Sequence, residues 1–419
     1  MPQTHAVRPS GAGPGRADIV VAGAGAVGLT LALALKSALS GRLSVTVCDP
    51  TLAGSPRDDD RAFAVAAGPR RMLQTLGVWD GELAGGSQPI RSMTITDSRV
   101  SDPVRPVFLD FSGEVGPDEP FAHMVDHGLL LRRLMARARE LGVELRPDTV
   151  AAVDADADIA EIRLAGGGAL RASLAVACDG ARSPLREQAG VGAVSWPYGQ
   201  SGIVATIGHE RDHEGRAEEH FLPSGPFAIL PLPGRRSSIV WTEASASVPA
   251  LLGLDDEDIL GEIERRFGLR LGLLTLEKRP VAYPLAFMVA RRFAARRLAL
   301  VGDAAHVVHP IAGQGLNLGL RDVAALAEAI VEAAGLGLDP GSPTVLDAYE
   351  RERRFDTVLM GGAMDALNRL FSNDLPPVRA VRDLGLSMVD RMPGLKRFFI
   401  GRAAGVAAGS SRLLRGEAL

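Results

Sequence analysis

The chain has 419 residues, of which 46% are hydrophobic, and its formal net charge at pH 7 is -4. At about 150 residues per domain this length predicts two or three domains with a large buried core. The slightly acidic balance argues against a nucleic-acid partner, because nucleic-acid-binding domains are usually basic. Only two cysteines occur, Cys48 and Cys178, which excludes a disulfide scaffold and favours a reducing cytoplasm.

The N-terminal stretch 1–17 is rich in proline and glycine, so we expect it to be disordered. Residues 19–35 then contain no charged side chain. This run is shorter than the roughly 20 residues of a membrane-spanning helix. Asp18 precedes it, where a signal peptide would carry positive charge. The sequence therefore predicts neither a membrane span nor export.

A βαβ unit with three glycines opens the ordered part of the chain. Gly23 allows a sharp turn after a buried strand, Gly25 lets the backbone approach a pyrophosphate, and Gly28 lets the following helix pack closely. Asp49 ends the next strand, at the position where a carboxylate accepts hydrogen bonds from ribose hydroxyls. The unit is better explained by a dinucleotide site than by a glycine-rich packing turn, but it does not distinguish NAD from FAD.

The elements that follow alternate between helix and strand before their period changes. Helices are predicted at 68–79 and 127–143, strands at 91–96 and 107–111, and a strand-turn-helix at 174–190. Short strand patterns at 201–242 predict an antiparallel sheet. A helix with an acidic first turn follows at 255–267, then a buried strand at 296–303, and the chain is mostly helical from 314.

This order predicts an α/β fold in which a discontinuous Rossmann-like nucleotide domain carries an inserted antiparallel β-sheet domain and C-terminal helices. The nucleotide domain comprises residues 18–85, 121–192 and 284–340. The inserted substrate domain comprises residues 86–120 and 193–283. The C-terminal helical region comprises residues 341–419.

Two further motifs follow buried strands. "CDGARS" contains Asp179 and Gly180, and taken alone it is an ordinary turn before a helix. "LVGDAAHVVHPIAGQGLNLGLRD" starts at Leu300. It places Asp303 at the carboxyl end of a strand, where α/β sheets bind ligands. A helix start follows in "AGQGLN", which suits an anion that develops in the same crevice.

Together the three motifs resemble the FAD-dependent aromatic hydroxylases of the para-hydroxybenzoate hydroxylase type. The segments "YGQSGIVATI", "EEHFLPSGPFAILPL" and "SIVWTE" more narrowly resemble the ubiquinone-biosynthesis hydroxylases, over about residues 18–415. The resemblance implies an FAD-dependent monooxygenase that hydroxylates the aromatic ring of a polyprenylated phenol precursor of ubiquinone. Its family forms a flavin C4a-hydroperoxide from O2, with NAD(P)H or another reductant as a transient donor.

Two alternatives stay open, an FAD-dependent reductase or dehydrogenase on this fold and a non-catalytic FAD-binding component of a biosynthetic complex. The resemblance adds expected cofactor contacts to the motif residues named above. The full expected cofactor-binding set is Gly23, Gly25, Gly28, Asp49, Arg61, Asp179, Gly180, Gly302, Asp303, Gly313, Gln314, Gly315 and Asn317. The candidate catalytic residues are Pro310, His306 and Tyr283.

Each candidate has a plainer interpretation. His306 and His309 have an HxxH spacing, but no nearby cysteine or second acid completes a ligand set, so we expect no metal. Tyr198 and Tyr283 could line the substrate site or simply pack in the core. Basic residues dominate 378–415. They indicate either a solvated helical face or contact with an anionic bilayer. In the second case a cytoplasmic bacterial protein would lie at the surface of the inner membrane, where it could also meet other ubiquinone-biosynthesis proteins.

Overall fold

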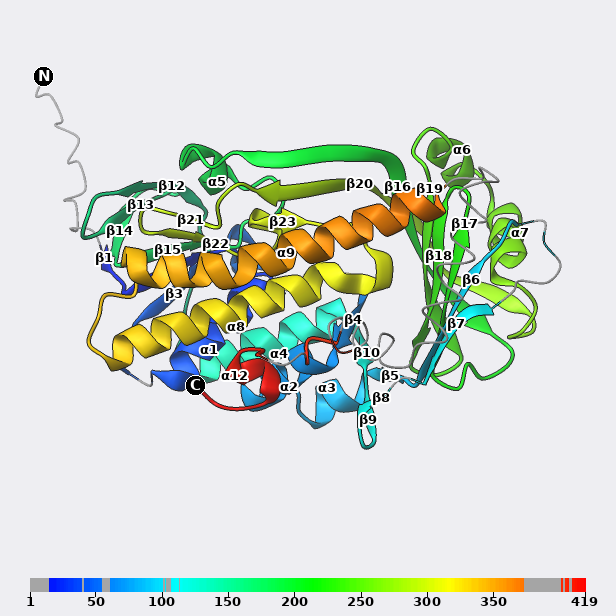
Figure 1. The fold of residues 1–419 in the computed structure, drawn as a ribbon, viewed down its shortest axis with the longest axis horizontal. Helices are drawn as coiled ribbons and strands as arrows, with labels where there is room; N and C mark the ends of the chain where they lie inside the picture. The colour runs from blue at the N-terminus through cyan, green and yellow to red at the C-terminus, as the bar shows by residue number, and fades with distance from the viewer. Residues whose placement is uncertain are drawn as a thin grey trace, which may run out of the picture.

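The computed structural model describes residues 15–39, 41–54, 61–100, 102, 107–112, 114–372, 401, 404–406 and 409–419. Two layered units lie side by side, and long strands and helices run from one into the other (Figure 1). The predicted α/β fold with an inserted sheet is confirmed.

The first unit is built on a six-stranded sheet. Its order is β11 (Glu144–Arg146), β3 (Val45–Cys48), β2 (Ile19–Ala22), β15 (Leu174–Ala177), β22 (Leu298–Leu300) and β21 (Ala294–Ala295). The first five strands are parallel and β21 is antiparallel. The strands come from three distant stretches of the chain, as the discontinuous Rossmann-like prediction requires. Strands β2, β3, β15 and β22 are apolar and fully buried, as parallel strands covered on both faces must be.

Helices α1 (Ala26–Ala38), α4 (His127–Glu140) and α8 (Gln314–Gly335) pack together in this unit. Helix α8 is held close to the sheet by Gly319, where a Cβ atom would lie 2.9 Å from Val27 Cγ2 and 3.3 Å from Gly302 Cα. Helix α9 (Pro343–Phe371) packs on α8 and runs from this unit toward the large sheet (Figure 1).

Smaller sheets flank this unit. One has the order β4 (Ala62–Ala66), β10 (Ala122–Asp126), β5 (Gln88–Ile90). Another has the order β1 (Gly15–Arg16), β14 (Ala169–Ala172), β13 (Ala160–Leu164), β12 (Val150–Ala155). Residues 15–17, which we expected to be disordered, are therefore ordered, because β1 pairs with β14 and Ala17 is buried. The rest of the predicted disordered stretch lies outside the described residues.

The second unit is an eight-stranded sheet. Its order is β23 (His306–Val307), β20 (Leu274–Ala290), β16 (Ala193–His209), β19 (Arg236–Ala244), β18 (Gly225–Leu232), β17 (Arg216–Leu222), β6 (Ser92–Asp97) and β7 (Val107–Ser112). Every neighbouring pair is antiparallel except β17 with β6, which is parallel. One face packs on α7 (Asp256–Phe267) through a core that includes Ile203, Phe227 and Trp241.

The two units are less separable than the predicted limits suggest. Strand β20 continues without a break through residue 284, where we placed a domain limit. Its edge partner is β23, which belongs to the late motif of the nucleotide unit. The remaining described elements are short. They are β8 (Glu114–Gly116), β9 (Glu119–Pro120), α2 (Ala67–Thr75), α3 (Gly81–Gly85), α5 (Pro184–Gln188), α6 (Val248–Leu252) and α12 (Arg412–Arg415). Among the described helices, none combines the length and apolar character needed to cross a bilayer.

Candidate functional site

The glycine turn between β2 and α1 has the geometry that its spacing predicts. Gly23 has φ +115°, and a Cβ atom there would lie 2.3 Å from the carbonyl oxygen of Cys178. At Gly28 a Cβ atom would lie 2.1 Å from the carbonyl oxygen of Gly23. At Gly25 nothing lies within 4 Å, and no side chain caps the helix. The first amides of α1 are therefore open to an anionic ligand.

The carboxylate of Asp49 lies beside this turn. Its Oδ2 accepts a hydrogen bond from the amide of Ala24 at 2.8 Å, and its Oδ1 accepts from the amide of Thr51 at 2.8 Å. These bonds fix the carboxylate at the carboxyl end of β3, next to the glycine turn. The structure thus brings together the two halves of the predicted dinucleotide motif.

The mid-chain motif joins the same site, because Cys178 contacts Gly23. The next residue, Asp179, has a buried Oδ1 without a hydrogen-bond partner, and burial raises the pKa of this carboxyl above its ordinary value. At Gly180, with φ +88°, a Cβ atom would meet nothing within 4 Å. An unpaired buried acceptor is costly, so a ligand that donates to Asp179 would satisfy it.

Asp303 follows β22 in the short 3-10 turn η2 (Gly302–Ala304). Its side chain is exposed, yet desolvation by the surrounding protein raises its pKa, opposed by the charges of His306 and Arg61. The guanidinium of Arg61 also lies over the ring of Tyr283, 5.7 Å from its centroid. Three of the predicted site residues, Arg61, Asp303 and Tyr283, are therefore neighbours although they come from distant parts of the chain.

Past Pro310, the loop forms η3 (Ile311–Gly313) and enters α8 through Gly313, whose φ is +63°. The side-chain amide of Asn317 makes its hydrogen bonds to backbone groups. Its Oδ1 accepts from Ala66 N at 2.9 Å, and its Nδ2 donates to the carbonyl oxygens of Ala64 and Gly313 at 2.8 and 3.0 Å. Asn317 therefore anchors the loop against β4. No side chain caps α8, and Gly315 is open, which leaves the helix end available to a ligand.

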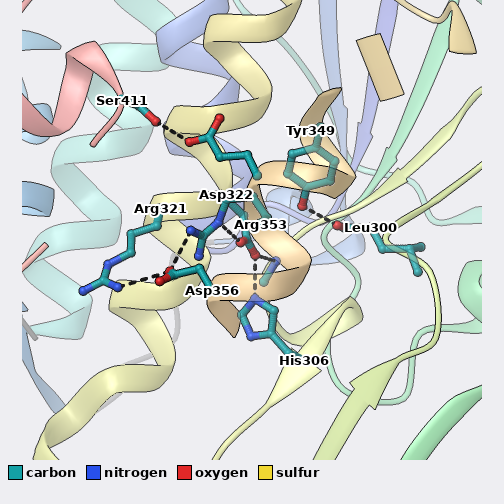
Figure 2. A network of polar contacts seen from close by, with 10 residues as sticks. Leu300, His306, Arg321, Asp322, Tyr349, Arg353, Asp356 and Ser411 are labelled. Atoms are coloured by element: carbon teal, nitrogen blue, oxygen red, sulfur yellow. Dashed lines mark hydrogen bonds and ion pairs between the residues drawn. The ribbon is translucent and has the colours of Figure 1, made fainter. Parts of the chain in front are cut away.

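A buried ionic network that the sequence did not indicate supports this loop (Figure 2). Asp322 is fully buried in α8. Its Oδ2 accepts from the amide of Gly302 at 3.0 Å and is 2.6 Å from Nε2 of His306, and its Oδ1 accepts from Nε of Arg353 at 2.8 Å. Arg353, from α9, also pairs with Asp356 at 2.9 Å. Burial alone would raise the pKa of Asp322, but His306 and Arg353 hold it below its ordinary value.

This network changes the interpretation of His306. Its ring is 1% exposed, and Nε2 is committed to Asp322. The geometry therefore favours a role for His306 in positioning the loop and argues against direct contact with a substrate. An acid inside the apolar stretch "GLRDVAAL" was the available sequence signal, because such a residue needs a buried partner.

His309 does not extend the network. It is 1% exposed, both of its ring nitrogens lack hydrogen-bond partners, and its ring lies edge-on to Tyr198 with centroids 5.2 Å apart. Burial lowers its pKa to about 4, so the ring is neutral at neutral pH. Within the part of the chain that the structure describes, no three His, Cys, Asp or Glu side chains are grouped to hold a metal.

Comparison with known proteins identifies the family. Residues 16–357 match the FAD binding domain family. The chain is 46% identical to a ubiquinone hydroxylase, UbiL, of Rhodospirillum rubrum over 408 residues, covering 96% of this chain and 94% of the relative. It is 36% identical to the 3-demethoxyubiquinol 3-hydroxylase of Escherichia coli over 399 residues, covering 93% and 98%. The chain belongs to the FAD-dependent ubiquinone-biosynthesis hydroxylases. The resemblance drawn from the three motifs is confirmed.

Solved structures support the fold alone. The p-nitrophenol 4-monooxygenase PnpA of Pseudomonas putida superposes with a TM-score of 0.75 at 20% identity, covering 94% of this chain and 100% of that one. The Diels-Alderase PyrE3 superposes with a TM-score of 0.71 at 23% identity, covering 93% and 81%. Because a hydroxylase and a cycloaddition enzyme share this architecture, the fold does not determine the reaction.

The residues present fit FAD. The open amides at Gly25 suit its pyrophosphate, the unpaired Oδ1 of Asp179 suits a donor on the cofactor, and the accessible Asp303 suits the hydroxyls of its ribityl chain. The uncapped start of α8 suits the electron-rich edge of the flavin ring. The individual contacts remain our expectation for a bound cofactor.

Replacing Asp322 with Asn should destabilise the protein by about 3 kcal/mol, because it removes the charge that pairs with both the buried Arg353 and the buried His306 and leaves Arg353 only Asp356. Urea denaturation measures this loss. The matched control is Asp347→Asn on the exposed face of α9, which should stay within about 0.5 kcal/mol of wild type. Equal stability of the two variants would contradict the role of the network.

Replacing Asp303 with Ala should weaken FAD binding about 100-fold, because two hydrogen bonds to a carboxylate are lost. The purified variant should therefore carry little flavin when the ratio of flavin to protein is measured by absorbance. Asp154→Ala, at an exposed position of β12, serves as the control. A full complement of FAD in Asp303→Ala would refute the assigned contact.

Proposed function

We propose that this protein is an FAD-dependent monooxygenase that hydroxylates the aromatic ring of a polyprenylated phenol precursor of ubiquinone. The observation that carries the proposal is similarity along nearly the whole chain to a ubiquinone hydroxylase and to a 3-demethoxyubiquinol 3-hydroxylase. A mitochondrial ubiquinone biosynthesis monooxygenase of Danio rerio, COQ6, is 30% identical over 434 residues, covering 90% of this chain and 88% of the relative. Three relatives that are hydroxylases or monooxygenases of ubiquinone or its biosynthesis favour one reaction class.

The bound flavin supplies the activation of O2, and the protein binds, orients and shields it. The start of α1 would hold the pyrophosphate, Asp49 the adenosine ribose, and Asp303 the ribityl chain. The start of α8, reached through Gly313, would stabilise negative charge on the flavin ring. In this proposal Pro310 and Tyr283 border the substrate ring, where exclusion of water would protect the reaction.

NAD(P)H serves in this proposal as a transient reductant. Across the described residues the structure has one Rossmann-like sheet, and its glycine turn is assigned to FAD. A donor that binds briefly over the flavin, transfers a hydride and leaves needs no dinucleotide fold of its own.

The proposal predicts that the purified protein is yellow and consumes O2 in step with hydroxylated product. Deleting the gene should make a quinone precursor that lacks one ring hydroxyl accumulate, as identified by mass spectrometry. Product formed without O2 uptake would indicate a reductase or dehydrogenase. If the protein binds FAD but a phenol does not stimulate reduction of that FAD, the protein is a non-catalytic component of a complex.

We also infer contact with a membrane surface, where a polyprenylated substrate resides. The basic residues of 378–415 that suggested this lie outside the described residues, apart from Arg412 and Arg415. Independent support comes from α9, where Phe355 is 72% exposed and Val358 and Leu359 are each 48% exposed. Arginines 292, 351 and 354 line the same surface recess as Phe355 and outnumber its two acids, Asp347 and Glu350. Apolar and basic side chains on one face suit an anionic bilayer.

The protein should sediment with anionic vesicles at low salt and be released at high salt, since the attraction is partly electrostatic. Phe355→Ser should reduce the bound fraction. Leu269→Ser, which changes an equally exposed apolar residue just past α7, should leave it unchanged. Absence of sedimentation at low salt would end the membrane hypothesis.

A further inference from the structure

Strand β17, which lies in the interior of the eight-stranded sheet, contains a carboxylate that no part of the assigned chemistry uses. Glu219 is 2% exposed. Desolvation by burial is the only cause of its altered acidity and raises the pKa of Glu219 to about 7, with no contribution from a hydrogen bond or a neighbouring charge. A buried glutamate without such a partner is rare, because transferring a carboxylate out of water is costly.

The strand pattern gives the direction of this side chain. Glu218 and His220 point to one face of the sheet, since His220 stacks on Phe227 in the core beneath α7. Glu219 therefore points to the opposite face, with Ala217 and Phe221 on either side of it. Glu218 differs in being paired, with Arg270 at 2.5 Å.

The face that carries Glu219 is the one turned to the cofactor unit. Phe221 clusters with Ile311 of the loop before α8. Ala217 clusters with Ala64 of β4, the strand to which Asn317 ties that loop. Glu219 thus lies between two contacts with the segments expected to border the flavin ring.

The residues beside Glu219 across the sheet are apolar and incompletely covered. Register places Ile95 on one side and Ala228 on the other, and then Val240, Val204 and Val281 in a row. The first four are partly exposed and Val281 is 52% exposed. By contrast, Ile203, Phe227 and Trp241 on the α7 face are at most 1% exposed. The row runs over about 19 Å at 4.8 Å per strand, so it suits a long apolar chain that ends at one polar group.

From this juxtaposition we infer that Glu219 binds the hydroxyl of the phenol substrate and acts as its general base. The inference rests on the proposed substrate class. In the step, the phenol O–H bond breaks, the proton moves to a carboxylate oxygen of Glu219, and the electron pair stays on the phenol oxygen. The phenolate so formed is more electron-rich at the ring carbons that are to be hydroxylated. A base whose pKa lies close to the working pH both accepts and returns a proton readily.

Binding of two probes tests this without turnover. The probes are 2-prenylphenol and its methyl ether, titrated calorimetrically into the FAD-loaded protein. Wild type should prefer the phenol about tenfold, and Glu219→Gln should lose that preference. Glu218→Gln, on the same strand but the opposite face, should keep it. Glu219→Asp should restore part of it, because a carboxylate is again present.

Turnover gives a second measure. Glu219→Gln should keep its FAD yet lose about 100-fold in kcat for hydroxylation, whereas Glu218→Gln should not. A Glu219→Gln variant that keeps both the phenol preference and kcat overturns the role of Glu219. If wild type binds neither probe and hydroxylates no phenol, the proposed substrate class fails instead, and the inference about Glu219 fails with it.

Discussion

The buried carboxylate of Asp322 is the constraint on which the site depends. It accepts hydrogen bonds from the amide of Gly302, from His306 and from Arg353, so three segments converge on one side chain. Desolvating a carboxylate costs several kcal/mol, and only complete pairing offsets that cost. Both oxygens of Asp322 are paired, and the bonds to Gly302 and His306 hold the two ends of the turn that carries Asp303.

The two units are organised around that turn. On one side, it continues β22 of the parallel sheet. On the other, its residues form β23 and join the edge of the large sheet. Arg61 and Tyr283 close the same region from the two units. The two units are therefore joined by a continuous framework of strand pairing that runs through β22, the turn and β23.

Much of the cofactor site could be predicted from the sequence because its signals are local. The spacing of Gly23 and Gly28 predicts a turn and a close packing contact between residues five positions apart, although Gly23 also lies against the distant Cys178. Arg353 and Glu219 carry no such signal, and the position of Asp322 in an apolar stretch indicates only that it needs a buried partner. The roles of all three depend on partners or faces contributed by distant segments. The predicted domain limit at residue 284 falls inside strand β20 for a related reason. The exposed and half-buried residues of this strand give way to four buried residues at 287–290, a change that in a sequence looks like two separate strands.

The pairing of β23 with β20 has a consequence for selectivity. Val307 lies opposite Met288, and His306 opposite Val289, so the cofactor-bearing turn is fixed to the substrate sheet by strand register. Moving that register by one residue would displace the turn by about 3.3 Å and turn every side chain of β23 to the other face. Under the proposed function, the alignment of β23 along β20 therefore contributes to the position of this turn relative to a bound aromatic ring.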